Sequence, residues 1–158
     1  MADPARWLCP PSAWRAQHSS SSDRTPMQML VSYPYLKLYL HQGASRALEA
    51  QWNGVPTSTL LRQATLKCVI LAREHRVGGW IADDRELGPV PPADLEWVAT
   101  YVLPLLIKGG VQRFARLEVV APLTQPVIGP AQERAQQQLS FELRSFTDPE
   151  AARAWAIG

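Results

Sequence analysis

The sequence predicts an α/β domain with a single mixed, mostly parallel sheet. Strand-like and helix-like segments alternate along the chain, as they do in the crossover units of parallel sheets. The apolar segment 77–83 is typical of a buried strand and lies between two helix-patterned segments. Ligands and partners of such sheets meet the carboxyl ends of the strands. We therefore expect Asp83, Asp84 and Arg85, at the end of this segment, to mark the edge of any site.

The first 32 residues are predicted to form a disordered or extended tail. Four prolines and a run of four serines leave them without a helix or strand period. The domain is expected to span residues 33–158. Met27 and Met29 stand just before its first expected strand, and either is a candidate start of translation.

Two alternating segments, 35–41 and 47–53, open the expected domain. Their apolar and polar residues alternate, and residues 42–45 supply a turn between them, which predicts an antiparallel hairpin. One face of this hairpin is expected in the core and the other partly in water. The side chains expected on the core face are Leu36, Leu38, Leu40, Leu48, Ala50 and Trp52.

Two helices are predicted on either side of segment 77–83. The first begins at Thr57 or Ser58, whose hydroxyls suit a helix cap, and runs to about Arg76. The second begins at Pro91 or Pro92, is kinked or ended by Pro104, and closes at Gly109-Gly110. Its expected buried stripe consists of Leu95, Val98, Val102, Leu105 and Leu106.

The remaining segments complete the order ββαβαβαβα. A strand is predicted over 113–121, with Ala115, Leu117, Val119 and Ala121 on one face. A polar helix over 131–138 and a strand over 141–146 follow. Asp148-Pro149-Glu150 then has the residues of a helix start, with Asp at the cap and Pro at the first helical position.

Composition favours one globular domain without nucleic acid as a partner. The chain has 158 residues, 46% of them apolar, and a formal net charge of +2 with Lys and Arg scattered among acidic residues. No apolar run is long enough for a membrane span, and the N-terminus lacks the apolar core of a secretory signal. We therefore expect a cytoplasmic protein. Cys9 and Cys68 are not expected to form a disulfide.

No sequence motif predicts catalysis, a cofactor or a metal. The three histidines have no cysteine or carboxylate at metal-ligand spacing. The chain also lacks a Gly-x-Ser-x-Gly elbow, a phosphate-binding Gly-Lys-Ser/Thr loop and a Gly-x-Gly-x-x-Gly motif. We accordingly assign no catalytic residue and no metal ligand.

The candidate contact residues are Asp83, Asp84, Arg85, Trp97 and Tyr101. Adjacent residues of a strand point to opposite faces, so the two acids share a site only if the strand ends between them. Arg85 is then expected to pair with one of them, and an Asp in this place also suits a loop-capping role. Trp97 lies off the main stripe of its helix and Tyr101 one turn further, which indicates an exposed aromatic pair. The alternative for Trp97 and Tyr101 is packing in the core.

This order of elements, with Asp83-Asp84-Arg85 and the segment Pro92 to Trp97, resembles the STAS-like domains of bacterial anti-sigma-factor antagonists. The resemblance covers roughly residues 33–158 and is closest to small stand-alone versions. It implies a non-enzymatic regulator that works through protein contact. Members of the family carry a phosphorylatable Ser or Thr just after the central strand. Between residues 81 and 101, Thr100 is the sole hydroxyl besides Tyr101, so that switch is not transferred to this chain.

Three functional hypotheses follow. The first is a cytoplasmic interaction module that contacts a protein through residues 83–90 and Trp97, with a homodimer through the exposed hairpin edge as a further option. The second is a carrier or sensor of a small apolar or lipid-like ligand, as in some relatives of the fold, with a pocket between the hairpin and the helix 95–106. The third is an enzyme with Asp83 or Asp84 as general base, which requires a raised carboxylate pKa in a cleft.

Overall fold

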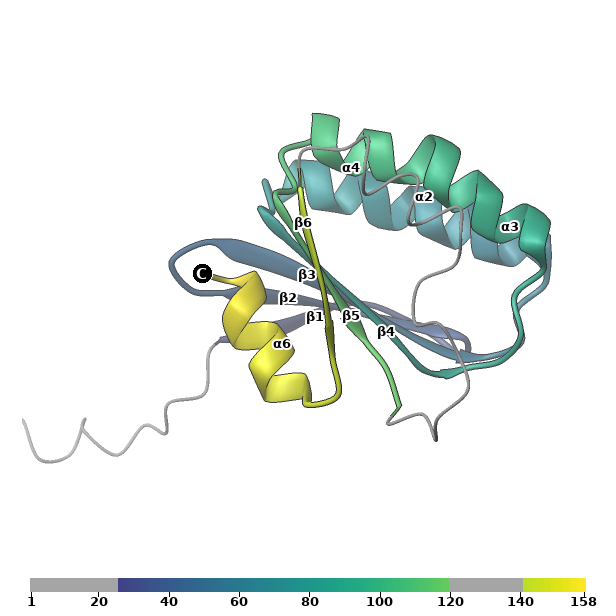
Figure 1. The fold of residues 1–158 in the computed structure, drawn as a ribbon, viewed down its shortest axis with the longest axis horizontal. Helices are drawn as coiled ribbons and strands as arrows, with labels where there is room; N and C mark the ends of the chain where they lie inside the picture. The colour runs from purple at the N-terminus through teal and green to yellow at the C-terminus, as the bar shows by residue number, and fades with distance from the viewer. Residues whose placement is uncertain (1–25, 120–140) are drawn as a thin grey trace, which may run out of the picture.

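The computed structural model describes residues 26–119 and 141–158, which form one six-stranded sheet with helices on both faces (Figure 1). The strands lie in chain order across the sheet. They are β1 (Met27–Tyr33), β2 (Leu36–Gln42), β3 (Arg46–Gly54), β4 (Gly79–Leu87), β5 (Arg113–Leu117) and β6 (Glu142–Phe146). Strands β1 to β3 are antiparallel, and β3 to β6 are parallel. The predicted α/β class with a single mixed sheet is confirmed.

The helices form two layers, one on each face of the sheet. They are α2 (Ser58–Glu74), α3 (Pro92–Trp97), the π-helical turn η2 (Val98–Val102), α4 (Leu103–Lys108) and α6 (Pro149–Ala156). Helix α2 and the continuous helix α3–η2–α4 cover one face, and α6 covers part of the other (Figure 1). We call these the two-helix face and the α6 face. None of the helices in the described ranges is long and apolar enough to cross a membrane.

Strand β1 corrects the prediction of a tail over residues 1–32. Residues 27–32 belong to a strand that pairs with β2, while residues 1–25 lie outside the described part. Met27 and Met29 remain 55% and 51% exposed, so this strand is held by backbone pairing more than by burial of one face. That explains why its sequence shows no clear alternation. The sheet edge on this side is therefore β1, and not the predicted hairpin.

The predicted hairpin is confirmed as β2 and β3. Leu36 pairs with Trp52, Leu38 with Ala50 and Leu40 with Leu48, and all six side chains are buried on the two-helix face. The opposite face is partly solvated, as expected, because Lys37 and Asn53 are exposed there. Its end near the turn is closed, however. His41 and Glu49 are both buried there, 2% and 0% exposed.

The second predicted helix contains the π turn, which changes its buried side. Leu103 donates its backbone N–H to the carbonyl of Val98, five residues earlier, and Pro104 directly after it has no N–H to donate. The extra residue of a π turn rotates all later positions. Leu105, predicted to be buried, is consequently 40% exposed. Leu95, also predicted to be buried, precedes the turn and is 42% exposed. The buried residues are Asp94, Ala99, Val102, Leu103 and Leu106.

The C-terminal elements agree with the prediction where they are described. Strand β5 is shorter than expected, because it ends at Leu117 and Val119 is 61% exposed. Ala121 and the predicted helix 131–138 lie outside the described residues. Strand β6 pairs in parallel with β5, and Asp148 caps α6 by accepting a hydrogen bond from the N–H of Glu150. Cys68 is a free, buried thiol.

Candidate functional site

Strand β4 sends its two adjacent acids to opposite faces of the sheet. The strand continues to Leu87 and does not end at Asp83. Alternation therefore places Asp83 on the α6 face and Asp84 on the two-helix face. The structure does not bring these two predicted contact residues into one site.

Asp83 belongs to a closed network. It is 1% exposed, and its carboxylate accepts hydrogen bonds from Arg85 Nε and Nη2, both at 2.9 Å, and from Gln51 Nε2 at 3.3 Å. The predicted pairing of Arg85 with one of the acids is thus found. The hydrogen bond from Asp83 raises the pKa of Arg85 and favours its charged form. The hydrogen bond from Gln51 joins this part of β4 to β3.

A second network on the α6 face was not predicted from the sequence. Glu49 on β3 accepts hydrogen bonds from Arg153 on α6, at 2.8 and 3.0 Å, and lies 2.5 Å from His41 Nε2. Burial by itself raises the pKa of Glu49, but the hydrogen bonds from His41 and Arg153 outweigh it and hold the pKa at about 2. Arg153 also bonds Glu150 at 2.9 Å. These contacts join α6 to the hairpin.

The predicted aromatic pair has two different environments. Trp97 is partly buried against the core, and the guanidinium of Arg62 lies 5.1 Å from the centre of its ring. Arg62 also bonds Asp94, which accepts a further hydrogen bond from Ser58. Tyr101 is 62% exposed. Trp97 therefore helps to join α3 to α2, while Tyr101 is open to solvent.

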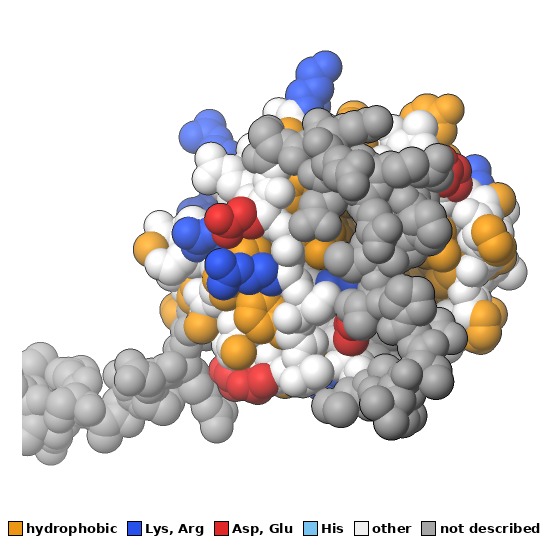
Figure 2. Space-filling view, in the orientation of Figure 1, with side chains coloured by type: hydrophobic (Ala, Val, Ile, Leu, Met, Phe, Trp, Pro, Cys, Tyr) orange, Lys and Arg blue, Asp and Glu red, His pale blue; other side chains and the backbone are white. Residues whose placement is uncertain are grey.

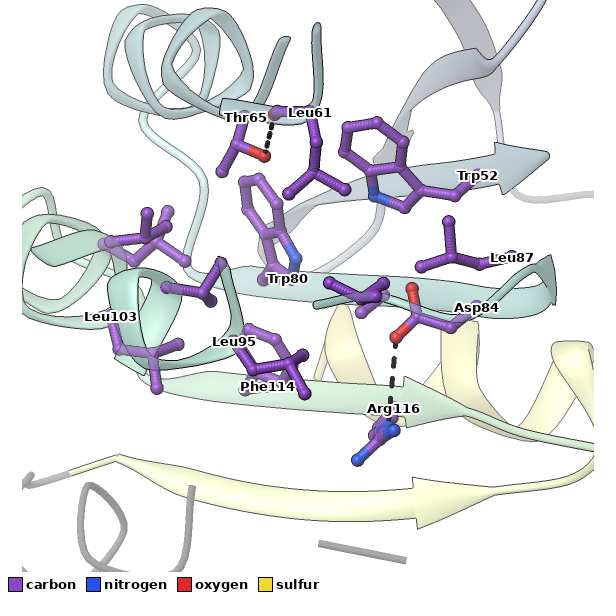
Figure 3. Close-up of a pocket in the computed structure, with 15 residues that line it drawn as sticks. Trp52, Leu61, Thr65, Trp80, Asp84, Leu87, Leu95, Leu103, Phe114 and Arg116 are labelled. Carbon is purple, nitrogen blue, oxygen red and sulfur yellow. Dashed lines mark hydrogen bonds and ion pairs between the residues drawn. The ribbon is translucent and has the colours of Figure 1, made fainter. Parts of the chain in front are cut away.

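The two-helix face contains a cavity of about 100 Å³ between the sheet and the helices (Figure 3). Trp52, Trp80 and Phe114 contribute aromatic walls from three neighbouring strands. The rings of Trp80 and Phe114 stack, with their centres 6.4 Å apart. Most of the other lining residues are aliphatic and come from α2 and α3–η2–α4. The cavity lies where the second hypothesis expects it, beside the hairpin and the helix 95–106.

The π turn contributes directly to this cavity. Val98 and Val102 of η2 line it, together with Leu103 and Leu106 of α4. Single π turns inside α-helices are frequent at functional sites. Here the turn sets which side chains of the helix reach the cavity.

Asp84 supplies the acidic group of the cavity. Figure 3 shows its carboxylate below Leu87 and Trp52, on the side of the sheet that holds Trp80. Its ion-pair partner is Arg116, but the distance from Arg116 Nε to Asp84 Oδ2 is 3.9 Å, longer than a hydrogen bond. Burial among apolar walls raises the pKa of Asp84 to about 6, although the guanidinium of Arg116 opposes this increase.

Arg116 and the aromatic walls were missed in the sequence. Arg116 follows Phe114 by two residues in β5, so both point to the two-helix face. The face of this strand that was predicted to be apolar is the other one, with Ala115 and Leu117. A charged residue at an inward position beside an aromatic residue was the available signal.

Comparison of the chain with protein-family models, with curated proteins and with solved structures found no significant match. The resemblance to STAS-like domains therefore stays a prediction. Within residues 26–119 and 141–158, no group of three or more His, Cys, Asp or Glu side chains is placed to hold a metal ion.

Proposed function

We propose that the protein binds a small, mainly apolar organic molecule in the cavity of the two-helix face, as a carrier or sensor. The observation that carries this proposal is an apolar and aromatic cavity with the Asp84 carboxylate turned into it. Small-molecule sites commonly combine such walls with a few polar groups that orient the ligand. The geometry thus favours the second hypothesis over the other two.

The size of the cavity supports a compact ligand. The cavity is partly open and offers about 100 Å³ of space beside the sheet. An engineered apolar cavity of about 150 Å³ binds benzene. A ring or a short branched chain fits this scale better than a long lipid chain.

The lining supports binding without chemical change. Thr65 is the hydroxyl-bearing residue of the described lining, and its hydroxyl already donates to the carbonyl of Leu61 at 2.7 Å. Asp84 has a raised pKa, which the third hypothesis requires, but the described lining offers it no nucleophile or second acid. We therefore propose a non-catalytic role that uses no cofactor.

The test is a titration with benzene. Binding is monitored through the indole N–H signals of Trp52 and Trp80 in nitrogen-15 NMR spectra. We expect saturable shifts of both signals in the native protein. Ala82→Leu places three more carbon atoms in the cavity and should weaken binding at least tenfold. Ala93→Leu makes the same change at an exposed position of α3 and should leave binding unchanged. Unshifted indole signals in the native protein, or equal binding by Ala82→Leu, would overturn the proposal.

A second candidate is a cytoplasmic regulatory module that contacts another protein. Leu95, Tyr101 and Leu105 are 42%, 62% and 40% exposed on α3–η2–α4, and Figure 2 shows hydrophobic side chains at the end of the molecule that holds α3. Tyr101 is the predicted contact residue that fits this role. Tyr101→Ser combined with Leu105→Ser should abolish the capture of any partner that uses this surface. An unchanged set of partners from the source cell would contradict it.

A further inference from the structure

Asp84 differs from the buried acids of the described chain in its hydrogen bonds and in its exposure. Glu49, Asp83 and Asp94 each accept hydrogen bonds from at least two side chains. Asp84 accepts none from the residues that the structure describes, and 29% of its side chain surface remains accessible. Its carboxylate is thus partly accessible, and a ligand that reaches it displaces no hydrogen bond from the described side chains. The Asp84 carboxylate is therefore the acidic group of the lining that is available to a ligand.

Arg116 does not fill this place. Its Nε lies 2.9 Å from Glu118 Oε1, a full ångström closer than to Asp84 Oδ2. Glu118 lies outside the described lining but partly neutralises Arg116, and with both acids ionised Asp84, Arg116 and Glu118 together carry a formal net charge of −1. A cation is the ligand charge that this group favours.

The aromatic walls favour the same charge. The faces of indole and phenyl rings are electron-rich and attract an ammonium group within about 6 Å, with Trp the strongest. Trp52, Trp80 and Phe114 all line the cavity. A neutral apolar ligand would use these walls but would leave Asp84 without a partner. An anionic ligand would be repelled by it.

From this juxtaposition we propose that the ligand is an organic ammonium ion, with an apolar body against the aromatic walls and its amino group hydrogen-bonded to Asp84. The inference rests on the binding function proposed above and names the chemical class of the ligand. The raised pKa of Asp84 is in agreement, since a bound cation compensates the charge that the apolar walls disfavour.

The experiment compares benzylamine with benzyl alcohol, which have the same ring and nearly the same shape. Dissociation constants are measured at pH 7.5 by the same NMR titration for the native protein, Asp84→Asn and Glu74→Gln. We expect benzylamine to bind the native protein at least tenfold more tightly than benzyl alcohol. Asp84→Asn should remove this preference and keep the affinity for benzyl alcohol. Glu74→Gln removes one acidic charge at the exposed end of α2 and should keep the preference.

The outcomes separate the two proposals. If benzyl alcohol binds as tightly as benzylamine, the ammonium inference is wrong and the binding function stands. A preference that survives Asp84→Asn also overturns the inference, because the amino group is then held elsewhere. If neither probe binds the native protein, both proposals fail.

Discussion

The acidic side chains on the two faces of the sheet differ in their hydrogen bonds and in their burial. On the α6 face, Glu49 and Asp83 are fully buried and each is enclosed by hydrogen bonds from basic or amide side chains. On the two-helix face, Asp84 faces a cavity and has Arg116 only at ion-pair distance. Asp83 and Asp84 are neighbours in one strand, so the difference comes from the surroundings alone. The difference is consistent with the proposal that the two-helix face is open to a ligand, whereas the α6 face is closed.

Packing also differs between the two faces: it is tighter on the α6 face. The α6 face is lined by small residues that let the helix approach closely: Ala47, Ala115, Ala152 and Ala156. A Cβ atom added to Gly79 on this face would lie 2.2 Å from the carbonyl oxygen of Ala156. The two-helix face has larger side chains and still leaves about 100 Å³ unfilled. Added atoms should therefore have very different effects on the two faces.

The largest expected effect is at Glu49. Glu49→Gln removes the buried anionic partner of Arg153 and leaves it only the exposed Glu150, and removing one member of a buried pair commonly costs about 3 kcal/mol or more. We expect the free energy of unfolding, measured by urea denaturation at pH 7, to decrease by about 3 kcal/mol. Glu150→Gln is the matched control, because Glu150 bonds the same arginine but its side chain is 82% exposed, and it should cost less than about 0.5 kcal/mol.

The pH dependence gives an independent check of this network. The pKa of Glu49 is about 2 in the folded protein and 4.5 ordinarily. The stabilisation from Glu49 is therefore complete above about pH 4.5 and is lost as the pH decreases toward 2. If Glu49→Gln lowers the free energy of unfolding at pH 7 by less than about 1 kcal/mol, the network does not stabilise the fold.

At Asp84 the same kind of substitution should have the opposite sign. Its pKa is about 6 in the folded protein and 3.8 ordinarily, so between these values the unfolded chain binds fewer protons and stability decreases as the pH rises. At about 1.4 kcal/mol for each pKa unit, the cost above pH 6 is up to about 3 kcal/mol. Asp84→Asn should therefore be more stable than the native protein at pH 8, by about 1 to 3 kcal/mol, with no difference below pH 4.

Asp83→Asn is the matched control for Asp84→Asn. It removes the charge from a carboxylate that Arg85 and Gln51 enclose, so we expect it to destabilise the protein at pH 8. Urea denaturation of both variants across pH 4 to 8 measures the contrast. A change of the same sign in both would remove the distinction between the two faces.

The fold was predictable from the sequence where one local pattern determined the structure. Alternation in 35–41 and 47–53 identified the hairpin and its core face, and Asp148 identified the start of α6. Strand β1 was missed, because its pairing with β2 leaves Met27 and Met29 half exposed and gives no alternation. A period of 3.6 residues likewise cannot anticipate the extra residue of η2.

The site was less predictable, because it depends on contacts between distant residues. Asp84 was a candidate, but its role depended on β4 continuing to Leu87, which no local signal showed. Arg153 lies 104 positions from Glu49, so the network that encloses Glu49 had no signature in either segment. Trp52 and Trp80 were expected as core residues, and only their arrangement around a cavity suggests a ligand.

The last comparison concerns carbon atoms added on each face. Gly79→Ala should destabilise the protein by about 1 to 3 kcal/mol, because its methyl group would displace the backbone of α6 at Ala156. Gly78→Ala is the matched control, since its nearest neighbour would be Ser45 Oγ at 3.8 Å, and it should change stability by less than about 0.5 kcal/mol.

Ala82→Leu completes this comparison from the other face of β4. It adds three carbon atoms where Gly79→Ala adds one, but it directs them into the cavity. We expect it to cost less than Gly79→Ala in urea denaturation, because the added atoms meet empty space and not the backbone of α6. If Ala82→Leu were the more destabilising of the two, the two-helix face would be as tightly packed as the α6 face. The cavity would then lack the room that a ligand needs.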